Sequence, residues 1–296
     1  MSKKCKIVSR LVDDLHEAGK LRVWSIIVTV FGDAIVPRGG TISLTALQNI
    51  LGNLGIEPNA VRTAMSRLAR DGWVERRKFG RQSFYLLAKG GMASFESATA
   101  RIYAAEPPHW DGRFELVLTG PDNLKSRMMF ERQMRRRGFG SPLNGLFIRP
   151  LTAEHNKGQI ENTFAVMEAC NLVSDSLPEF IEQSWQIEGL NTRYQHLIDK
   201  YKGVLEHAKE GKLSQPEDCL AVRILLIHDW RRLILQDADL PLELKPREWN
   251  GEKARAIVAE LYHRILENSE CVLDACLAAP GENLPQADRA LGNRFR

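Results

Sequence analysis

Residues 41–87, TISLTALQNILGNLGIEPNAVRTAMSRLARDGWVERRKFGRQSFYLL, decide the fold of the N-terminal part of the chain. The pattern predicts an extended piece at residues 41–44, helices at 46–54 and 58–70, and strands at 73–77 and 82–87. Ser43 or Thr45 can cap the first helix and Gly55 ends it. Pro58 suits the first turn of the second helix. Gly80 is the turn residue between the two strands, which we expect to form a hairpin.

The second helix has one apolar stripe and one polar face. Its apolar residues fall at the i, i+3, i+4 and i+7 positions of a buried face: Val61, Ala64, Met65 and Leu68. The other faces carry hydrogen-bonding and cationic side chains: Asn59, Arg62, Thr63, Ser66, Arg67 and Arg70. Arginine binds guanine and asparagine binds adenine in a bidentate manner, and hydroxyl groups suit phosphates. This face is therefore predicted to contact DNA in the major groove.

The hairpin adds further basic residues around its turn: Arg76, Arg77, Lys78 and Arg81. A basic hairpin of this kind can follow the phosphate backbone or enter the minor groove. Apolar spacing over residues 7–36 predicts one or two preceding helices, with a break near Gly19. The order helix, helix, helix, hairpin is that of a winged helix-turn-helix. The alternative is a solvated amphipathic helix followed by a charged hairpin without a nucleic-acid partner.

Basic residues are concentrated in the first third of the chain. Residues 1–105 hold 16 basic residues (Lys and Arg) and 8 acidic residues (Asp and Glu), whereas the whole chain holds 41 basic and 37 acidic residues. The N-terminal part is therefore strongly basic and the remainder is mildly acidic. This asymmetry is typical of a polyanion-binding module joined to a body of another kind.

The composition places the chain among folded globular proteins. Its 44% apolar and 26% charged residues argue against disorder, and 296 residues suggest two or three domains. The longest apolar run, near 23–30, is too short to span a bilayer, and the N-terminus has no signal-peptide pattern. Five scattered cysteines indicate reduced thiols. We therefore expect a cytoplasmic protein.

Strand and helix patterns alternate in the centre of the chain. We expect strands at residues 114–118 and 145–148, helices at residues 124–137 and 161–170, and an extended segment near 171–173. This alternation fits a small α+β, ferredoxin-like unit. From residue 181 the pattern is helical, over about 184–209, 216–236 and 251–277, and the tail 280–296 is expected to be weakly ordered.

These patterns predict an α+β, mostly helical chain with three domains. Residues 1–105 form the DNA-binding domain, 106–180 the ferredoxin-like domain, and 181–296 a helical domain.

Signatures of catalysis and of metal binding are absent from the sequence. It has no Walker A sequence, no GxGxxG pattern and no Cys/His set with zinc-finger spacing. Cys271 and Cys276 lie five residues apart on an apolar helix, where packing in the core is the expected role. We therefore predict no catalytic residues, no metal and no resident cofactor.

Three stretches resemble the PaaX-like repressors of phenylacetic acid degradation. They are residues 37–91; 103–120 with 135–150, YAAEPPHWDGRFELVLTG and RRRGFGSPLNGLFIRP; and 223–265, which begins RILLIHDWRRLILQDADLP. The last contains the family's Ile-His-aromatic-Arg-Arg core at residues 227–232, Leu240-Pro241, and Trp-x-Gly at 249–251. Ala238 departs from the pattern, which has Pro there. The resemblance covers roughly residues 20–275 in order.

The resemblance implies a winged-helix domain, a central Cas2-like ferredoxin domain and a helical C-terminal domain, residues 181–296, for ligand sensing and dimerisation. It also implies a homodimer that represses genes of phenylacetate catabolism. The implied effector is phenylacetyl-CoA or a related aryl-CoA, and not free phenylacetate.

A CoA thioester requires cations for its phosphates and apolar or aromatic walls for its acyl group. The candidate ligand-binding residues are the body's aromatic residues and arginines: Trp110, Arg113, Trp185, Arg193, Tyr194, Arg223, Trp230, Arg231, Arg232 and Trp249. Two other functions stay open. One is an acyl-CoA-processing enzyme with the winged helix as a docking module, and the other is a nucleic-acid-binding scaffold without a ligand.

Overall fold

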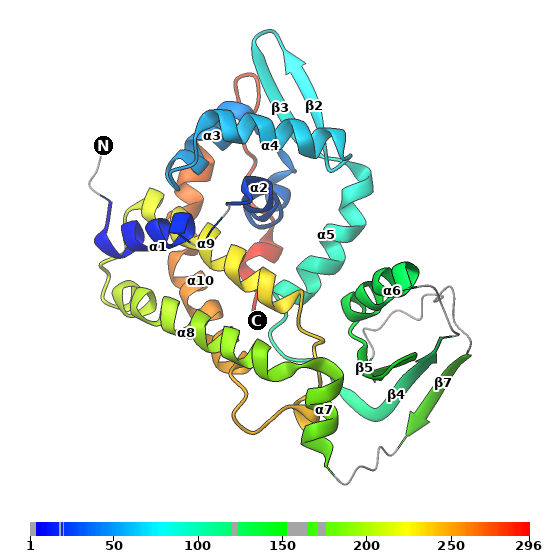
Figure 1. Cartoon of the computed structure of the whole chain (residues 1–296). Helices are drawn as coiled ribbons and strands as arrows, with labels where there is room; N and C mark the ends of the chain where they lie inside the picture. Colours follow the sequence, from blue (N-terminus) through cyan, green and yellow to red (C-terminus); the bar gives the residue numbers. More distant parts are fainter. Residues whose placement is uncertain (1–3, 18, 20, 120–123, 153–164, 171–175) are drawn as a thin grey trace. The chain divides into compact units, whose positions relative to one another are not determined.

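The computed structural model describes residues 4–17, 19, 21–119, 124–152, 165–170 and 176–296. It is a mixed α/β structure with antiparallel sheets (Figure 1). Its contacts divide it into two compact units. Unit 1 consists of residues 1–103, 197–231 and 255–296, and unit 2 of residues 104–196 and 232–254. The three predicted sequence ranges remain a prediction, because they divide the chain by sequence order and the units divide it by contacts.

The N-terminal elements of unit 1 follow one another closely. They are α1 (Lys6–Glu17), α2 (Val23–Val30), the π-helix η1 (Phe31–Ile35), η2 (Val36–Arg38), β1 (Thr41–Ser43), α3 (Leu44–Gly52), α4 (Pro58–Arg70), β2 (Val74–Phe79), β3 (Gln82–Leu87) and α5 (Lys89–Ile102). The later elements assigned wholly or mainly to this unit are α8 (Ile187–Lys209), α9 (Pro216–Ile234), α10 (Gly251–Asp274), β8 (Leu277–Ala279), β9 (Glu282–Asn283) and η4 (Arg289–Asn293).

Two helices form the core of unit 1. The α2 sequence VWSIIVTV is apolar on most of its surface, and Ile26, Ile27 and Val30 have no exposed surface. Helix α9 is buried over most of its length in the same way. Because such helices have no hydrated face, they belong in the interior. Helix α2 packs against α4, and its Thr29 hydroxyl lies 3.1 Å from His228 Nδ1 of α9.

The prediction for residues 41–87 is confirmed element by element. Ser43 is the cap of α3, because its Oγ accepts a hydrogen bond from the N–H of Ala46 at 3.1 Å. Pro58 opens α4, as its missing N–H permits. Strand β3 pairs with both β2 and β1, so the extended piece closes a three-stranded antiparallel sheet in the order β1-β3-β2.

Unit 2 is built on a four-stranded antiparallel sheet in the order β5-β6-β4-β7. Its elements are β4 (Trp110–Leu118), α6 (Leu124–Arg136), β5 (Gly140–Leu143), β6 (Leu146–Thr152), β7 (Ala165–Cys170), α7 (Leu177–Trp185) and η3 (Leu242–Leu244). Val117, Met134, Phe139 and Phe147 form one buried cluster, so α6 packs on the sheet through Met134.

Two predictions are corrected here. Residues 165–170 are strand β7 and not a helix, because they pair in register with β4, from Arg113↔Cys170 to Leu118↔Ala165. Residues 161–164 and the segment near 171–173 lie outside the described residues. The tail is ordered, since it forms β8, β9 and η4, and the Phe295 N–H donates to the carbonyl of Tyr103 at 2.9 Å.

The long predicted helix 184–209 is interrupted in the structure. Gln186 adopts a left-handed φ of 54°, which ends α7 and lets α8 start in a new direction. Within the described ranges, none of the helices combines the length and apolar character needed to cross a membrane.

Candidate nucleic-acid interface and ligand-binding residues

Helix α4 separates its two faces as its sequence predicts. Val61, Ala64, Met65 and Leu68 are buried. The six residues predicted to contact DNA are all exposed: Asn59, Arg62, Thr63, Ser66, Arg67 and Arg70. The burial of one stripe fixes the rotation of the helix about its axis. Consequently the opposite face presents these polar side chains together.

Contacts along this face hold the side chains loosely. Arg62 Nη1 donates to Asn59 Oδ1 at 3.0 Å, which joins the two residue types that read guanine and adenine. Arg67 and Arg70 lie 3.5 and 3.4 Å from Asp71. Such exposed ion pairs contribute at most about 1 kcal/mol. Both guanidinium groups can therefore exchange this partner for a phosphate or a base.

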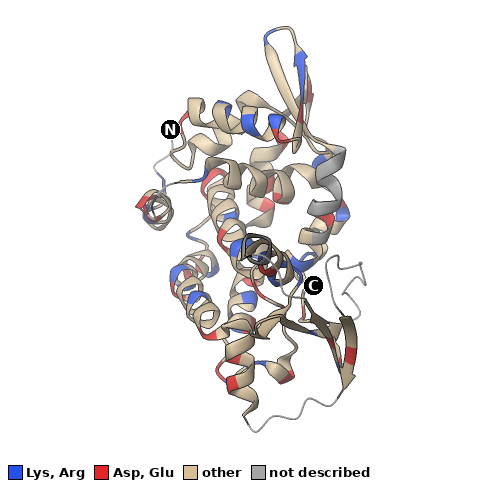
Figure 2. Cartoon of the chain, turned by 45° about the vertical axis from the view of Figure 1, so that its right-hand side comes forward, with Lys and Arg blue, Asp and Glu red and all other residues tan. Residues whose placement is uncertain are grey.

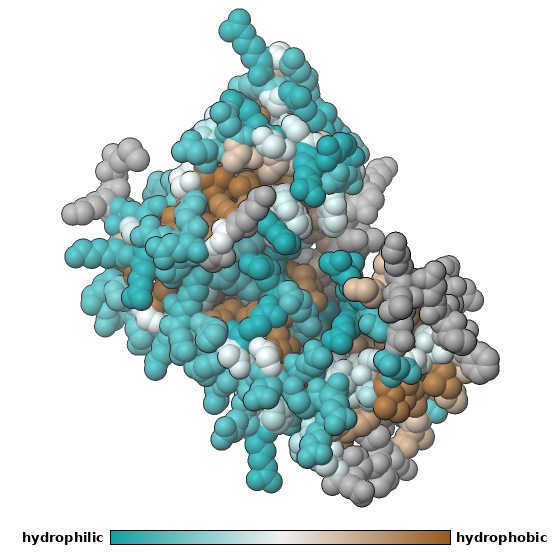
Figure 3. Space-filling model, viewed as in Figure 1, coloured by the Kyte–Doolittle hydropathy of each residue, from teal (hydrophilic) through white to brown (hydrophobic). Residues whose placement is uncertain are grey.

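The β2–β3 hairpin projects beyond α4 and carries the other predicted basic residues (Figure 1). Arg76, Arg77, Lys78 and Arg81 are exposed, and Arg76 donates to Ser83 Oγ at 2.9 and 3.2 Å. In Figure 2, the positions of Lys and Arg colour parts of the ribbon of α4 and of this hairpin blue. Figure 3 shows largely hydrophilic side chains over the projecting tip. The hairpin is thus a charged arm in which Phe79, next to the turn, packs edge to face against Phe84.

Three of the predicted ligand-binding residues have internal partners in unit 1. Trp230 is fully buried and donates from Nε1 to the carbonyl of Ile102 at 2.7 Å. Arg231 donates to Thr29 Oγ1 and to Ser25, both at 2.8 Å. Arg223 is also fully buried. These three side chains hold α9 in the core.

The remaining predicted residues are spread over several places. Trp110 Nε1 donates to the carbonyl of Arg113 at 2.7 Å, and the Arg113 guanidinium pairs with Asp111 at 2.7 Å. Tyr194 and Trp249 pack edge to face with centroids 5.4 Å apart. Arg232 is exposed.

Trp185 and Arg193 line one pocket of unit 2. The structure therefore does not bring the ten residues together at one site.

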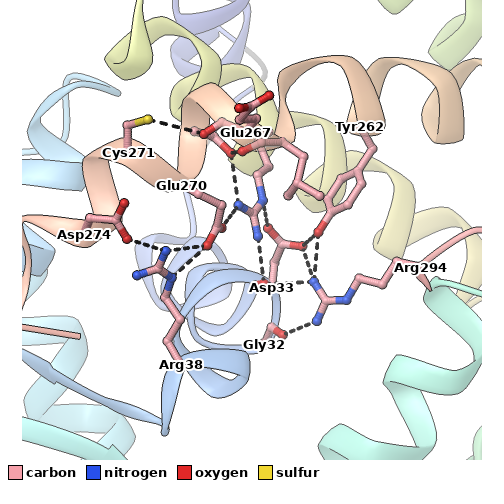
Figure 4. Close-up of polar contacts among 12 residues, drawn as sticks. Gly32, Asp33, Arg38, Tyr262, Glu267, Glu270, Cys271, Asp274 and Arg294 are labelled. Atoms are coloured by element: carbon pink, nitrogen blue, oxygen red, sulfur yellow. Dashed lines mark hydrogen bonds and ion pairs between the residues drawn. The ribbon is translucent and has the colours of Figure 1, made fainter. Parts of the chain in front are cut away.

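A buried ionic network around Asp33 was not predicted from the sequence (Figure 4). Asp33 lies on η1 and is 1% exposed. Its carboxylate accepts hydrogen bonds from Arg223 Nε at 2.6 Å, Arg294 Nη1 at 2.8 Å, Tyr103 Oη at 2.6 Å and Tyr262 Oη at 3.1 Å. Asp33 thereby links η1 to α9, α10 and the C-terminus.

Further charges extend this network. Arg223 also pairs with Glu270, and Glu270 in turn pairs with Arg38 at 2.7 Å. Arg38 binds Asp274 as well, at 2.7 Å. Three arginines thus meet three carboxylates, so the charges of the network are balanced.

The protonation of this network follows from its burial. Burial raises the pKa of Tyr262 to about 12 and the pKa of Tyr103 well above its usual value. Burial lowers the pKa of Arg223, but Asp33, Tyr262 and Glu270 together outweigh this effect and leave that pKa above its usual value. At neutral pH all three groups are therefore proton donors to carboxylates.

One signal in the sequence could have revealed Asp33. It is the only charged residue in the apolar run from 23 to 36. A charge on a buried helix must be paired, since an unpaired one would be too costly. Its arginine partners, by contrast, lie about 190 to 260 residues later in the chain, so no local pattern points to them.

Two family models and one named protein match this chain. Residues 22–91 match the family model described as PaaX-like protein, and residues 185–275 match the model described as PaaX-like protein C-terminal domain. The transcriptional repressor PaaX of Escherichia coli (strain K12) is 31% identical over 275 residues, which is 90% of this chain and 86% of that protein.

The fold is similar to that of a solved structure. It is the uncharacterized protein Rv0674 from Mycobacterium tuberculosis, with a TM-score of 0.51 and 18% identity, covering 77% of this chain and 90% of that one.

Proposed function

The chain belongs to the PaaX-like family, and on that premise we propose that it is a transcriptional repressor that binds double-stranded DNA. The observation that carries the proposal is the exposed polar face of α4 beside a basic hairpin, both within the segment that matches the family. The named relative is a regulator and not an enzyme, so the proposed activity is binding without chemistry.

The N-terminal elements support a winged helix-turn-helix. Three helices, α2, α3 and α4, precede the hairpin, and β1 pairs with the hairpin strand β3. In this interpretation α4 enters the major groove and the β2–β3 hairpin is the wing on the backbone or minor groove. Asn59, Arg62, Thr63, Ser66, Arg67 and Arg70 then contact bases or phosphates, and Arg76, Arg77, Lys78 and Arg81 neutralise phosphates.

The centre of the chain supports a ferredoxin-like domain. Strand β4 is followed by α6, β5, β6 and β7, and the four strands form one antiparallel sheet. The segment between β6 and β7, where a second helix of such a domain would fall, lies outside the described residues. We accordingly keep the three-part organisation, with 1–105, 106–180 and 181–296, as part of the proposal.

The proposed target genes and the proposed effector are inferred from the family resemblance. We propose that the protein represses genes of phenylacetate catabolism and that phenylacetyl-CoA or a related aryl-CoA releases it from DNA. A homodimer would supply two recognition helices for a two-fold operator. The remaining alternative is a nucleic-acid-binding scaffold without a ligand. Release of DNA by the ligand distinguishes a repressor from such a scaffold.

Loss of charge on the wing is expected to weaken binding to all DNA sequences alike. In the double variant Arg77→Ala, Arg81→Ala, the slope of log K against log salt should flatten by about one unit for each lost phosphate contact, because fewer counterions are released. Fluorescence anisotropy at several salt concentrations measures this slope. The double variant Arg247→Ala, Arg264→Ala removes the same charge from exposed positions elsewhere and should keep the wild-type slope. A wild-type slope in the wing variant would remove the hairpin from the interface.

Binding of phenylacetyl-CoA and of DNA should oppose each other. A coupling of about 1–3 kcal/mol would lower DNA affinity roughly 5- to 150-fold, and DNA should weaken the ligand by the same factor. Calorimetric titration of phenylacetyl-CoA, with and without operator DNA, tests this reciprocity. Free phenylacetate should bind in neither case.

Equal ligand affinity with and without DNA would contradict the switch. Light scattering at micromolar concentration tests the dimer separately, and a monomer would contradict the proposed assembly.

A further inference from the structure

A pocket of about 380 Å³ in unit 2 has a rigid aromatic wall and a basic rim. Its wall is formed by Trp185 of α7, Phe139 before β5 and Ile187 at the start of α8. Its rim carries Arg135 from the last turn of α6 and Arg193 from α8. With Gln236 and Ala238, three stretches of the sequence, 135–139, 184–193 and 236–238, thus converge on one hollow.

The position of Trp185 is fixed by two contacts with the Gly138-Phe139-Gly140 segment. Its Nε1 donates to the carbonyl of Gly138 at 3.0 Å. A Cβ on Gly140 would lie 2.6 Å from ring atoms of Trp185, so glycine is what lets the ring approach the backbone this closely. Gln186, with its left-handed φ, then turns the chain so that α8 starts on the other side of the pocket. The aromatic wall is therefore preorganised.

The rim carries uncompensated positive charge. Arg193 donates to Gln236 Oε1 at 2.9 Å, a neutral partner that orients the guanidinium without cancelling its charge. Both Arg135 and Arg193 are exposed, and none of the described residues that line the pocket is acidic. The nearby carboxylate of Glu182 is engaged with the N–H of Glu188 at 2.9 Å.

We propose that this pocket binds the phosphorylated, ring-bearing end of an anionic ligand, with phosphate on Arg135 and Arg193 and a planar ring against the Trp185 wall. Guanidinium groups bind phosphate oxygens through charge-assisted, often bidentate hydrogen bonds. A volume of about 380 Å³ is at the small end of ligand pockets, which suits part of a large ligand. The inference rests on the proposed function, because an aryl-CoA effector carries such an end in its adenosine 3′-phosphate 5′-diphosphate part.

Titration of the full-length protein with four probes tests the assignment. The probes are phenylacetyl-CoA, adenosine 3′,5′-bisphosphate, inorganic phosphate and phenylacetate, measured by calorimetry. The first two should bind the wild type, the bisphosphate more weakly. The double variant Arg135→Ala, Arg193→Ala should lose roughly 100-fold in affinity for both, about tenfold for each charge-assisted contact. Arg193→Lys should recover part of the loss, since it keeps charge but not the bidentate geometry.

The control is Arg247→Ala, an exposed arginine of the same unit that does not line the pocket. It should bind all probes like the wild type. Because the exchanged arginines are exposed, the variants should also keep the wild-type melting temperature, which checks that they fold.

The outcomes separate this inference from the proposed function. If phenylacetyl-CoA binds the wild type and the double variant equally, the pocket assignment is wrong and the proposed function stands. If, against expectation, the wild type binds phenylacetate, and the double variant loses this binding but keeps the bisphosphate, the pocket takes an aryl carboxylate and the inference is overturned. If neither nucleotide probe binds the wild type, the inference fails, and release of DNA by phenylacetyl-CoA decides the proposed function on its own.

Discussion

Replacement of Asp33 by Ala is expected to lower the free energy of unfolding by about 3–5 kcal/mol, because it leaves two buried arginines without their shared carboxylate. Arg223 is fully buried and Arg294 is 9% exposed, so water cannot replace the lost partner. Since a typical domain is stable by about 5–15 kcal/mol, this change would remove a large part of the total. Urea denaturation followed by circular dichroism measures the difference.

Asp274→Ala is the matched control for this change. The control change also removes a carboxylate from an arginine of the network, Arg38. The Asp274 side chain is 61% exposed, however, so we expect the free energy of unfolding to fall by less than about 1 kcal/mol. Tyr262→Phe removes one hydrogen bond to Asp33 and should cost about 1 kcal/mol. An Asp33→Ala protein as stable as the Asp274→Ala protein would show that the network is not what holds η1 to α9 and the C-terminus.

Exchange of Arg62 or Arg67 for Ala should cost about 1–3 kcal/mol in binding to operator DNA and less on random DNA. Both side chains lie on the exposed face of α4, where a helix in the major groove meets base edges. Competition experiments with operator and scrambled duplexes give both free energies for each variant.

The ratio of the two losses decides the role of each arginine. A larger loss on operator DNA indicates base reading. Equal losses on both duplexes would mean phosphate contact only, and unchanged binding would take α4 out of the interface. Arg264→Ala, an exposed arginine on α10 paired with Glu260, should behave as the wild type on both duplexes.

The elements between residues 41 and 87 were predictable because their signals are local. The cap at Ser43, the proline at Pro58 and the apolar stripe of α4 each act within a few residues. The strand β7 was not predictable in this way. Its pairing partner β4 lies some 50 residues earlier, and this long-range pairing overrode the helical pattern read over 161–170.

The order of the C-terminal tail also depends on distant contacts. Arg294 reaches Asp33, 261 residues earlier, and Phe295 packs against Tyr103 and Tyr262. The predicted ligand-binding residues show the same limit. Composition identified the arginines and aromatic residues of the body, but only tertiary packing shows that Trp230 and Arg223 are core residues and that Trp185 and Arg193 share a pocket.

The account is tested most directly by titrating wild-type protein onto the promoter DNA beside its own gene, and onto a scrambled duplex, with and without phenylacetyl-CoA. We predict binding to the promoter at least 10³-fold tighter than to the scrambled duplex, and release by phenylacetyl-CoA but not by phenylacetate. Equal affinity for the two duplexes, or promoter binding that phenylacetyl-CoA leaves unchanged, would contradict a ligand-released repressor.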